Sequence, residues 1–267
     1  MKTYGFIGCG NMAKAMIGGI VSTGLANGSS VYASNPSAPS LEEMHAAYGI
    51  QTSHDNTVPA KNADILVLSV KPHFYESVIS EIRDCLSKDT IVVMIAAGQT
   101  ISVNESRFGK PVKLVRVMPN TPALVGEAMS AVTFNDQLTE EDKAAVLKML
   151  RSFGKAEEVP ESLMDAVTGV SGSSPAYVYL FIEAMADAAV LHGMPRAKAY
   201  TFVAQSVLGA AKMVLETGSH PGALKDNVCS PGGTTIEAVA ALERSGMRAA
   251  VIDAIDTCVK KSKAMSK

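Results

Sequence analysis

A glycine-rich segment near the N-terminus, Gly8-Cys9-Gly10-Asn11-Met12-Ala13, restricts the possible folds of this chain more than any other feature. It directly follows an apolar run at 4–7 and precedes a stretch with helical spacing. Strand, turn and helix in this order are the context in which the motif G-x-G-x-x-G/A binds dinucleotides. There the first glycine makes a tight turn, the second lets the backbone approach a pyrophosphate, and a small third residue lets helix pack on strand. An ordinary glycine-rich turn is the alternative interpretation.

The first part of the chain alternates apolar runs with helical stretches. The runs expected as strands are 4–7, 30–33, 65–70, 91–96 and 112–118, with 128–134 and 156–159 as additional candidates. Helical spacing is seen at 12–22, 41–47, 75–86, after 101 and at 139–151, and Ser40 with Glu43 has the spacing of a capping box. Continuously apolar strands separated by helices are typical of a parallel sheet that is covered on both faces. We therefore expect an α/β Rossmann domain, doubly wound and mostly parallel, over residues 1–162.

The remainder, 163–267, is expected to be an all-α domain. Helical runs lie at 176–191, 196–216, 235–244 and 248–262, and Ser174 before Pro175 has the pattern of an N-cap. The many small side chains allow helices to approach closely, which favours a homodimer formed through this domain. The apolar stretch at 166–182 contains glycines, serines and a proline, so we interpret it as a loop and a helix start, and no membrane contact is expected.

Composition excludes several classes of protein. The 267 residues carry 24 Lys+Arg and 26 Asp+Glu, a net charge of −2, so there is no basic excess for nucleic acid. The 4 cysteines are far apart, which indicates reduced thiols and a cytoplasmic protein. Glu183 and Asp187 share a helical face without a histidine at ligand spacing, so no metal site is expected.

Polar and small residues follow the expected strands, at the edge where such sheets bind ligands. The second strand ends in Ser34-Asn35-Pro36-Ser37, without the acid that usually accepts the ribose hydroxyl of NAD, so NADPH is favoured and NADH is possible. Ser69-Val70-Lys71-Pro72, Ala96-Ala97 and Asn120 end the next three strands. Farther on, Ser230-Pro231-Gly232-Gly233-Thr234-Thr235 opens a helix with amides and hydroxyls suited to a small carboxylate, or is a plain cap.

Taken together, these segments resemble the pyrroline-5-carboxylate reductase family over essentially the whole chain. The segments are FIGCGNMA at 6–13, SVKP at 69–72, AAG at 96–98, MPNTP at 118–122, VSGSSPAY at 170–177 and HPGALKDNVCSPGGTTIEAV at 220–239. The resemblance implies NAD(P)H-dependent reduction of the cyclic imine 1-pyrroline-5-carboxylate to L-proline, the last step of proline biosynthesis. It also implies interlocked homodimers, which some members assemble into larger rings.

Carried onto this sequence, the resemblance implies two sets of contacts. Those to the cofactor are Ile7, Gly8, Cys9, Gly10, Asn11, Met12, Ser34, Asn56, Ser69, Val70, Lys71, Pro72, Ala96, Ala97 and Asn120. Asn35 is added to the expected cofactor contacts from the sequence itself, because its amide follows the second strand. Those to the substrate are Asn227, Ser230, Gly232, Gly233, Thr234 and Thr235, of which Thr235 is the expected catalytic residue, beside the ring nitrogen as donor or orienter.

Two other functions remain open from the sequence. A β-hydroxyacid dehydrogenase would have a similar arrangement of domains, but its catalytic lysine is missing from the corresponding stretch 172–183. A non-catalytic protein that senses dinucleotides would keep the fold, but would have no need for the 230–235 loop.

Overall fold

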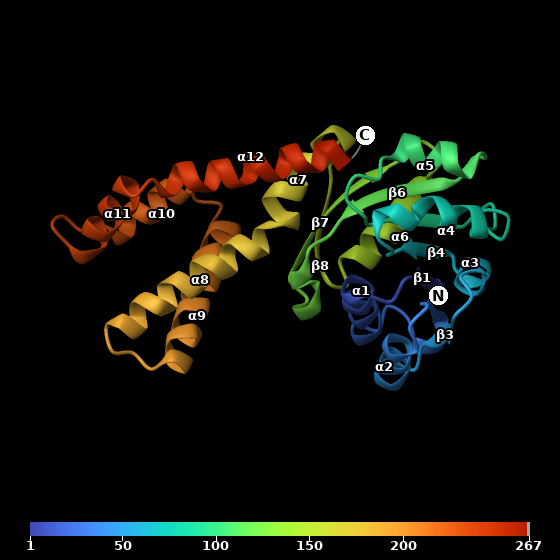
Figure 1. Cartoon of the computed structure of the whole chain (residues 1–267), viewed down its shortest axis with the longest axis horizontal. Coiled ribbons are helices and arrows are strands. Elements are labelled where there is room, and N and C mark those ends of the chain that lie inside the picture. Colours follow the sequence, from blue (N-terminus) through green and yellow to red (C-terminus); the bar gives the residue numbers. More distant parts are fainter. Residues whose placement is uncertain (266–267) are drawn as a thin grey trace. The chain divides into compact units, whose positions relative to one another are not determined.

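The computed structural model describes residues 1–265, and its contacts divide the chain into two compact units (Figure 1). The first unit comprises Met1–Ser173 together with the C-terminal segment that begins at Cys258, and the second is Ser174–Thr257. This division differs from the expected one at 162/163. Residues 163–173 and the C-terminal segment are helical, as expected of the second part, but they pack with the first: the Ser262 hydroxyl donates to Asp165 Oδ1 at 2.6 Å.

An eight-stranded sheet forms the centre of the first unit. Its strands are β1 (Tyr4–Ile7), β2 (Val31–Ser34), β3 (Gln51–Ser53), β4 (Ile65–Leu68), β5 (Ile91–Met94), β6 (Lys113–Met118), β7 (Ala128–Phe134) and β8 (Gly154–Glu158). The order is β3-β2-β1-β4-β5-β6-β7-β8, and all neighbours pair in parallel except β6 and β7. The strand order therefore reverses at β1, between β2 and β4, which is the topological switch point where such sheets bind dinucleotides.

Helices cover both faces of this sheet. One core cluster joins α1 (Asn11–Ser22), α2 (Ala38–Tyr48) and α6 (Glu140–Leu150) to strand residues such as Phe6, and the other joins α3 (Thr57–Asn62), α4 (Tyr75–Ile82) and α5 (Ile101–Phe108) to residues such as Ile7. Phe6 and Ile7 are both buried, because successive side chains of a strand point to opposite faces and each face has its own helical layer. The predicted doubly wound α/β domain is confirmed.

Two short elements in this unit were not predicted, β3 and α3. Strand β3 is Gln-Thr-Ser, exposed or half-exposed at the sheet edge, so it has no apolar run. The predicted capping box of Ser40 and Glu43 is wrong. Helix α2 already begins at Ala38, with Pro39 in its first turn, and Glu43 instead pairs with Lys14 of α1 at 2.5 Å.

The stretch expected as a loop around residue 170 is helical. The short α7 (Met164–Val167) runs into a π-helix at Thr168–Gly172, and Ser173 has right-handed helical dihedrals just before α8 (Ser174–Leu191). Ser174 is therefore not an N-cap, because the chain before it does not leave the helical conformation. The single-turn π-helix absorbs the irregular composition of this stretch without breaking the helix.

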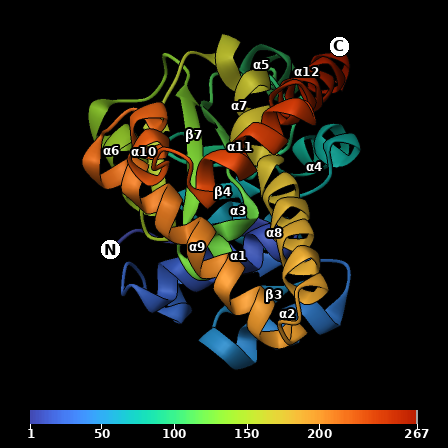
Figure 2. The ribbon, with the colours of Figure 1, turned by 90° about the vertical axis from the view of Figure 1, so that its left-hand side faces the viewer.

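The second unit is all-helical. After α8 come α9 (Arg196–Thr217), α10 (Pro221–Val228), α11 (Thr234–Arg244) and α12 (Met247–Met265), whose last residues belong to the first unit; Figure 2 shows α8 beside α9. Helix α10 was not predicted, although it begins with a proline after His220, whose Nδ1 accepts from the Gly222 amide at 3.0 Å.

Large apolar side chains of the second unit are exposed. They include Tyr179, Leu180, Leu191, Phe202, Leu208, Leu215 and Ile252. One stretch among the described residues, Glu161–Leu191, is long and apolar enough by length and composition alone to cross a membrane, and 6% of its most apolar window is buried within the chain. Exposed apolar surface of this extent is typical of sites that bind another protein or a membrane.

Candidate functional site

The residues expected to contact a cofactor gather at one edge of the sheet. Ile7 pairs with Ser34 and with Leu68, and Leu68 pairs with Met94, so β1, β2, β4 and β5 end in register. The residues that follow those ends are 8–12, 35, 69–72 and 96–97, while Asn56 follows β3 and Asn120 follows β6. The structure therefore brings the whole predicted set together at the carboxyl edge, where open α/β sheets bind their ligands.

The two glycines of the N-terminal turn have different roles. Gly8 has a φ of +91°, and a Cβ placed on it would lie 2.7 Å from the Ser69 carbonyl oxygen. Gly10 has extended dihedrals and precedes α1, and a Cβ placed on it would meet no atom within 4 Å. No side chain caps α1 at Gly10, so the first amides of that helix face open space. This arrangement fits a pyrophosphate.

The side chains after β2 and β3 form a hydrogen-bonded network. The Ser34 hydroxyl donates to Asn56 Oδ1 at 2.8 Å, and Asn56 Nδ2 donates to Glu81 Oε2 of α4 at 2.8 Å. Asn35 Oδ1 accepts from the Cys9 amide at 3.2 Å, which links the network to the glycine turn. Sequence reasoning missed Glu81, because only the fold brings α4 next to Asn56.

A buried tyrosine connects the ends of β4 and β5. The Tyr75 hydroxyl donates to the Leu68 carbonyl at 2.9 Å and accepts from the Ala96 amide at 3.2 Å. Burial raises the pKa of Tyr75, so its hydroxyl stays protonated and keeps both bonds. The Ser69 hydroxyl donates to the Gly8 carbonyl at 2.6 Å, while Lys71 is exposed. Tyr75 is a second residue that sequence reasoning missed; it fixes the backbone at Ala96.

Two predicted cofactor residues have local structural partners. Asn120 is buried; its Nδ2 donates to the Ser171 carbonyl at 3.1 Å and its Oδ1 accepts from the Met129 amide at 2.9 Å. The Cys9 side chain is also buried, and its burial raises the pKa of the thiol, although Lys14 partly opposes this. Backbone groups of Cys9 remain at the turn.

The residues expected to bind substrate lie in the second unit. Asn227 is in the last turn of α10, and Ser230 to Gly233 form a turn in which the Gly233 amide donates to the Ser230 carbonyl at 3.0 Å. Gly232 has a φ of +67°, and Gly233 is the N-cap of α11 without a side-chain cap. Helix α11 begins at Thr234, so the amides of its first turn have no partner within the helix.

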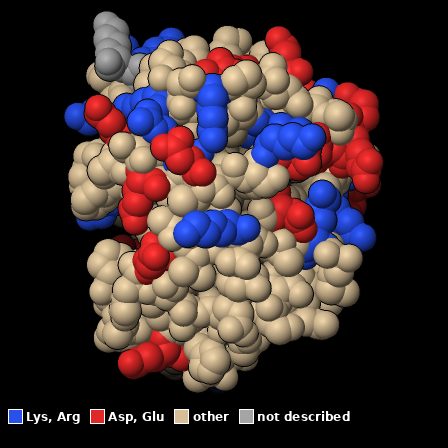
Figure 3. All heavy atoms as spheres, turned by 90° about the vertical axis from the view of Figure 1, so that its right-hand side faces the viewer, with Lys and Arg blue, Asp and Glu red and all other residues tan. Residues whose placement is uncertain are grey.

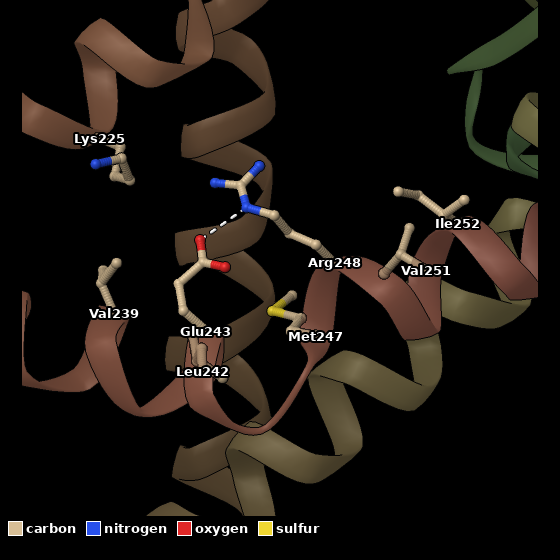
Figure 4. A pocket seen from close by; sticks show the side chains of 8 residues that line it. All are labelled: Lys225, Val239, Leu242, Glu243, Met247, Arg248, Val251 and Ile252. Carbon is tan, nitrogen blue, oxygen red and sulfur yellow. Dashed lines mark hydrogen bonds and ion pairs between the residues drawn. The ribbon is translucent and has the colours of Figure 1, made fainter.

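A separate hollow in this unit lies among α10, α11 and α12, with a volume of about 440 Å³. Figure 4 shows its lining: apolar side chains, together with Lys225 and an ion pair between Arg248 Nε and Glu243 Oε1 at 2.7 Å. The apolar residues are Val239, Leu242, Met247, Val251 and Ile252. None of the residues expected to bind substrate lines this hollow.

Neither the charges on one face of the first unit nor the described titratable side chains mark a further ion site. On the face of the first unit shown in Figure 3, basic and acidic side chains lie side by side rather than in fields of one sign. Among the described residues, no group of three or more His, Cys, Asp and Glu is placed to hold a metal ion.

The doubly wound sheet and its glycine turn place the chain among the NAD(P)-binding oxidoreductases. Two family models match it: "NADP oxidoreductase coenzyme F420-dependent" over residues 3–98, and "Pyrroline-5-carboxylate reductase dimerisation" over 161–265. The pyrroline-5-carboxylate reductase of Escherichia coli (strain K12) is 53% identical over 100% of this chain and 99% of its own length. The chain belongs to the pyrroline-5-carboxylate reductase family.

Solved structures agree with this assignment. A pyrroline-5-carboxylate reductase from Coxiella burnetii superposes with a TM-score of 0.91 at 35% identity, covering 100% of this chain and 99% of that one. A pyrroline carboxylate reductase from Plasmodium falciparum with NADP bound gives 0.91 at 34% identity, covering 100% and 98%. The predicted family, its NAD(P)H-dependent activity in proline biosynthesis and the dimerising helical domain are thereby confirmed, and the β-hydroxyacid dehydrogenase alternative is set aside.

Proposed function

We propose that the carboxyl edge of the sheet binds NADPH and that the turn before α11 binds the carboxylate of 1-pyrroline-5-carboxylate. The observation that carries the first half is the fit at the glycine turn. Gly10 leaves open space beside the uncapped start of α1, and a phosphate there accepts hydrogen bonds from backbone amides. The other residues expected to contact the cofactor lie along the same edge, although the side chain of Asn120 is engaged by Ser171 and Met129.

NADPH is preferred over NADH in this proposal. Ser34 ends β2 without a carboxylate, so nothing at that position repels a 2′-phosphate or accepts the ribose hydroxyl of NAD. The relative from Plasmodium falciparum, which superposes over its full length, carries NADP. NADH remains a usable substitute.

The turn before α11 suits the substrate carboxylate for three reasons. Its glycines let the backbone fold tightly, the first amides of α11 have no intrahelical partner, and the positive end of the helix dipole favours an anion. Ser230, Thr234 and Thr235 add hydroxyl groups, and Asn227 adds an amide at the end of α10. Thr235 is half-buried in the first turn of α11, next to the turn proposed to bind the carboxylate.

Bound NADPH supplies a hydride to the carbon of the C=N bond. A substrate that enters as the iminium cation already carries the proton that ends on the ring nitrogen, so the protein needs no strong acid. Its main contribution is to fix the substrate in position, an effect that can lower a barrier by about 7–11 kcal/mol when the geometry is ideal. Thr235 beside the ring nitrogen orients that N–H group.

The direct test follows the nicotinamide absorbance of NADPH mixed with the protein and pyrroline-5-carboxylate. Rapid oxidation is expected, whereas binding of NADPH without turnover would support the dinucleotide-sensing alternative. Thr235→Ala should lower kcat at least tenfold, about 1.4 kcal/mol, without changing the affinity for NADPH. Thr235→Ser keeps the hydroxyl and should retain most of the activity. If the alanine variant turns over as the wild type does, the role of Thr235 is refuted.

The dimerisation match implies a homodimer through the C-terminal helices, and this pairing covers the exposed apolar side chains of α8 and α9. We extend the proposal to a larger ring of dimers in the cytoplasm. Light scattering measures the mass in solution: a dimer alone would contradict the ring, and a monomer would contradict both.

A further inference from the structure

The loop after β2 has few free donors for a 2′-phosphate. The Ser34 hydroxyl already donates to Asn56 at 2.8 Å, and Asn35 Nδ2 donates to the Ser37 carbonyl at 3.1 Å. Residue 36 is a proline, which has no backbone N–H. The Ser37 hydroxyl makes no cap bond at the start of α2, so the loop keeps a neutral donor of its own, but a cationic donor has to come from outside it.

His54 is placed to supply that donor. It follows β3, the neighbour of β2, and its Nδ1 lies 2.8 Å from the Asn35 carbonyl oxygen. A carbonyl oxygen only accepts, so Nδ1 carries the proton and donates. The ring is thereby fixed against the loop with Nε2 on its far side. Among the described residues with a hydrogen bond to residues 34–37, His54 is the one whose side chain can become a cation.

The surrounding charges make a cation at this position important. Glu42 of α2 lines the same small hollow as His54, Asp55 follows it in the chain, and Glu81 of α4 holds Asn56. Lys61 of α3 is close enough to Asp55 for its positive charge to help lower the pKa of that carboxyl group. Three carboxylates near one loop repel a phosphate. An imidazolium at His54 offsets one of these charges, and both of its ring nitrogens donate.

We propose that His54 determines the preference for NADPH, with Nε2–H of its imidazolium donating to the 2′-phosphate while Nδ1–H holds the loop through Asn35. This inference rests on the proposed binding of NADPH at the carboxyl edge. It assigns a specificity role to a side chain that forms no part of the glycine motif.

The test compares the affinities for NADPH and NADH in His54→Asn and His54→Gln. An asparagine amide occupies the place of Nδ1 and keeps the bond to Asn35, but it has no group at the Nε2 position and no charge. Loss of one charge-assisted hydrogen bond corresponds to about 10- to 150-fold, so NADPH should bind at least tenfold more weakly to His54→Asn, with NADH unchanged. His54→Gln places a neutral donor near the position of Nε2. Its affinity for NADPH should therefore lie between those of the wild type and His54→Asn.

His45 provides a matched control, because its Nδ1 also contacts a backbone carbonyl, that of Ile50, at 2.7 Å, but in the last turn of α2. His45→Asn should leave the ratio of the two affinities unchanged.

Equal changes for both nucleotides in His54→Asn, or no change for either, would overturn the proposal. These outcomes differ from a failure of the proposed function, in which the wild-type protein itself would bind neither nucleotide.

Discussion

The second glycine of the N-terminal turn provides the sharpest separation of binding from folding. In Gly10→Ala the added methyl group projects into space where no atom lies within 4 Å, and φ of −83° is accessible to any residue. The folded state therefore accepts alanine without steric strain. The less flexible unfolded chain favours alanine by about 0.4–1 kcal/mol, but alanine is a poorer N-cap than glycine, so we expect a stability close to that of the wild type. The same methyl group occupies the approach of a pyrophosphate to the start of α1.

The expected loss of affinity follows from the bonds that the methyl group prevents. If the phosphate has to withdraw from one backbone amide, it loses a charge-assisted hydrogen bond of about 1.5–3 kcal/mol. NADPH should then bind about 10- to 150-fold more weakly. Titration calorimetry with NADPH gives the affinity, and urea unfolding of the same sample gives the stability.

Gly8→Ala is the comparison variant. Alanine at a φ of +91° carries the left-handed penalty of about 1–2 kcal/mol, and its Cβ would lie 2.7 Å from the Ser69 carbonyl oxygen. The backbone has to shift, which weakens the bond from the Gly8 amide to Ser34 of β2. We expect a loss of stability of about 2–3 kcal/mol. Normal NADPH affinity in Gly10→Ala, or equal stability losses in the two variants, would refute this account of the turn.

Two further substitutions probe the first unit. Tyr75→Phe leaves the Ala96 amide without its hydrogen-bond partner. We therefore expect the free energy of unfolding to fall by about 1–3 kcal/mol and the KM for NADPH to rise. Wild-type values of both would contradict the role of Tyr75. Burial would raise the pKa of Asp142, but hydrogen bonds from Lys113 and Thr139 outweigh it and lower that pKa. This pKa is lower in the folded than in the unfolded state, so its stabilisation is complete above the unfolded value of about 3.9 and disappears as the pH falls through the folded one. Asp142→Asn should therefore have a lower free energy of unfolding than the wild type near neutral pH. Urea unfolding should show that the difference between the two proteins shrinks in acid. A difference that stays constant with pH would contradict this role of Asp142.

The sequence predicted the parts of the fold that depend on buried runs. Strands β1, β4 and β5 are apolar at every position but Gly5 and are fully buried, so their existence and parallel pairing follow from local composition. Strand β3 could not be predicted in this way, because its polar residues are held by pairing with β2 rather than by burial. The π-helix at 168–172 was missed for the opposite reason, since its two glycines and its serine are tolerated by packing within the first unit.

The candidate site shows the same limit. The glycine turn and the 230–235 loop are contiguous in sequence, so their spacing alone indicated anion binding. Glu81 and Tyr75 act through partners 25 and 21 residues away, Asn56 and Ala96, and no local pattern marks them. Such residues become visible only when the topology places α4 beside the ends of β3, β4 and β5.

The packing of the chain's last described turns has a practical consequence for dissecting the protein. Met265 lies so close to Gly98, beside Ala96 and Ala97, that a Cβ on the glycine would come within 2.8 Å of the Met265 carbonyl oxygen. A recombinant fragment that stops at residue 162 would lack both this neighbour and the Asp165–Ser262 bond. An affinity tag fused directly after Met265 would begin beside Gly98, at the nucleotide edge, so a tag at the N-terminus is the safer choice for measuring nucleotide binding.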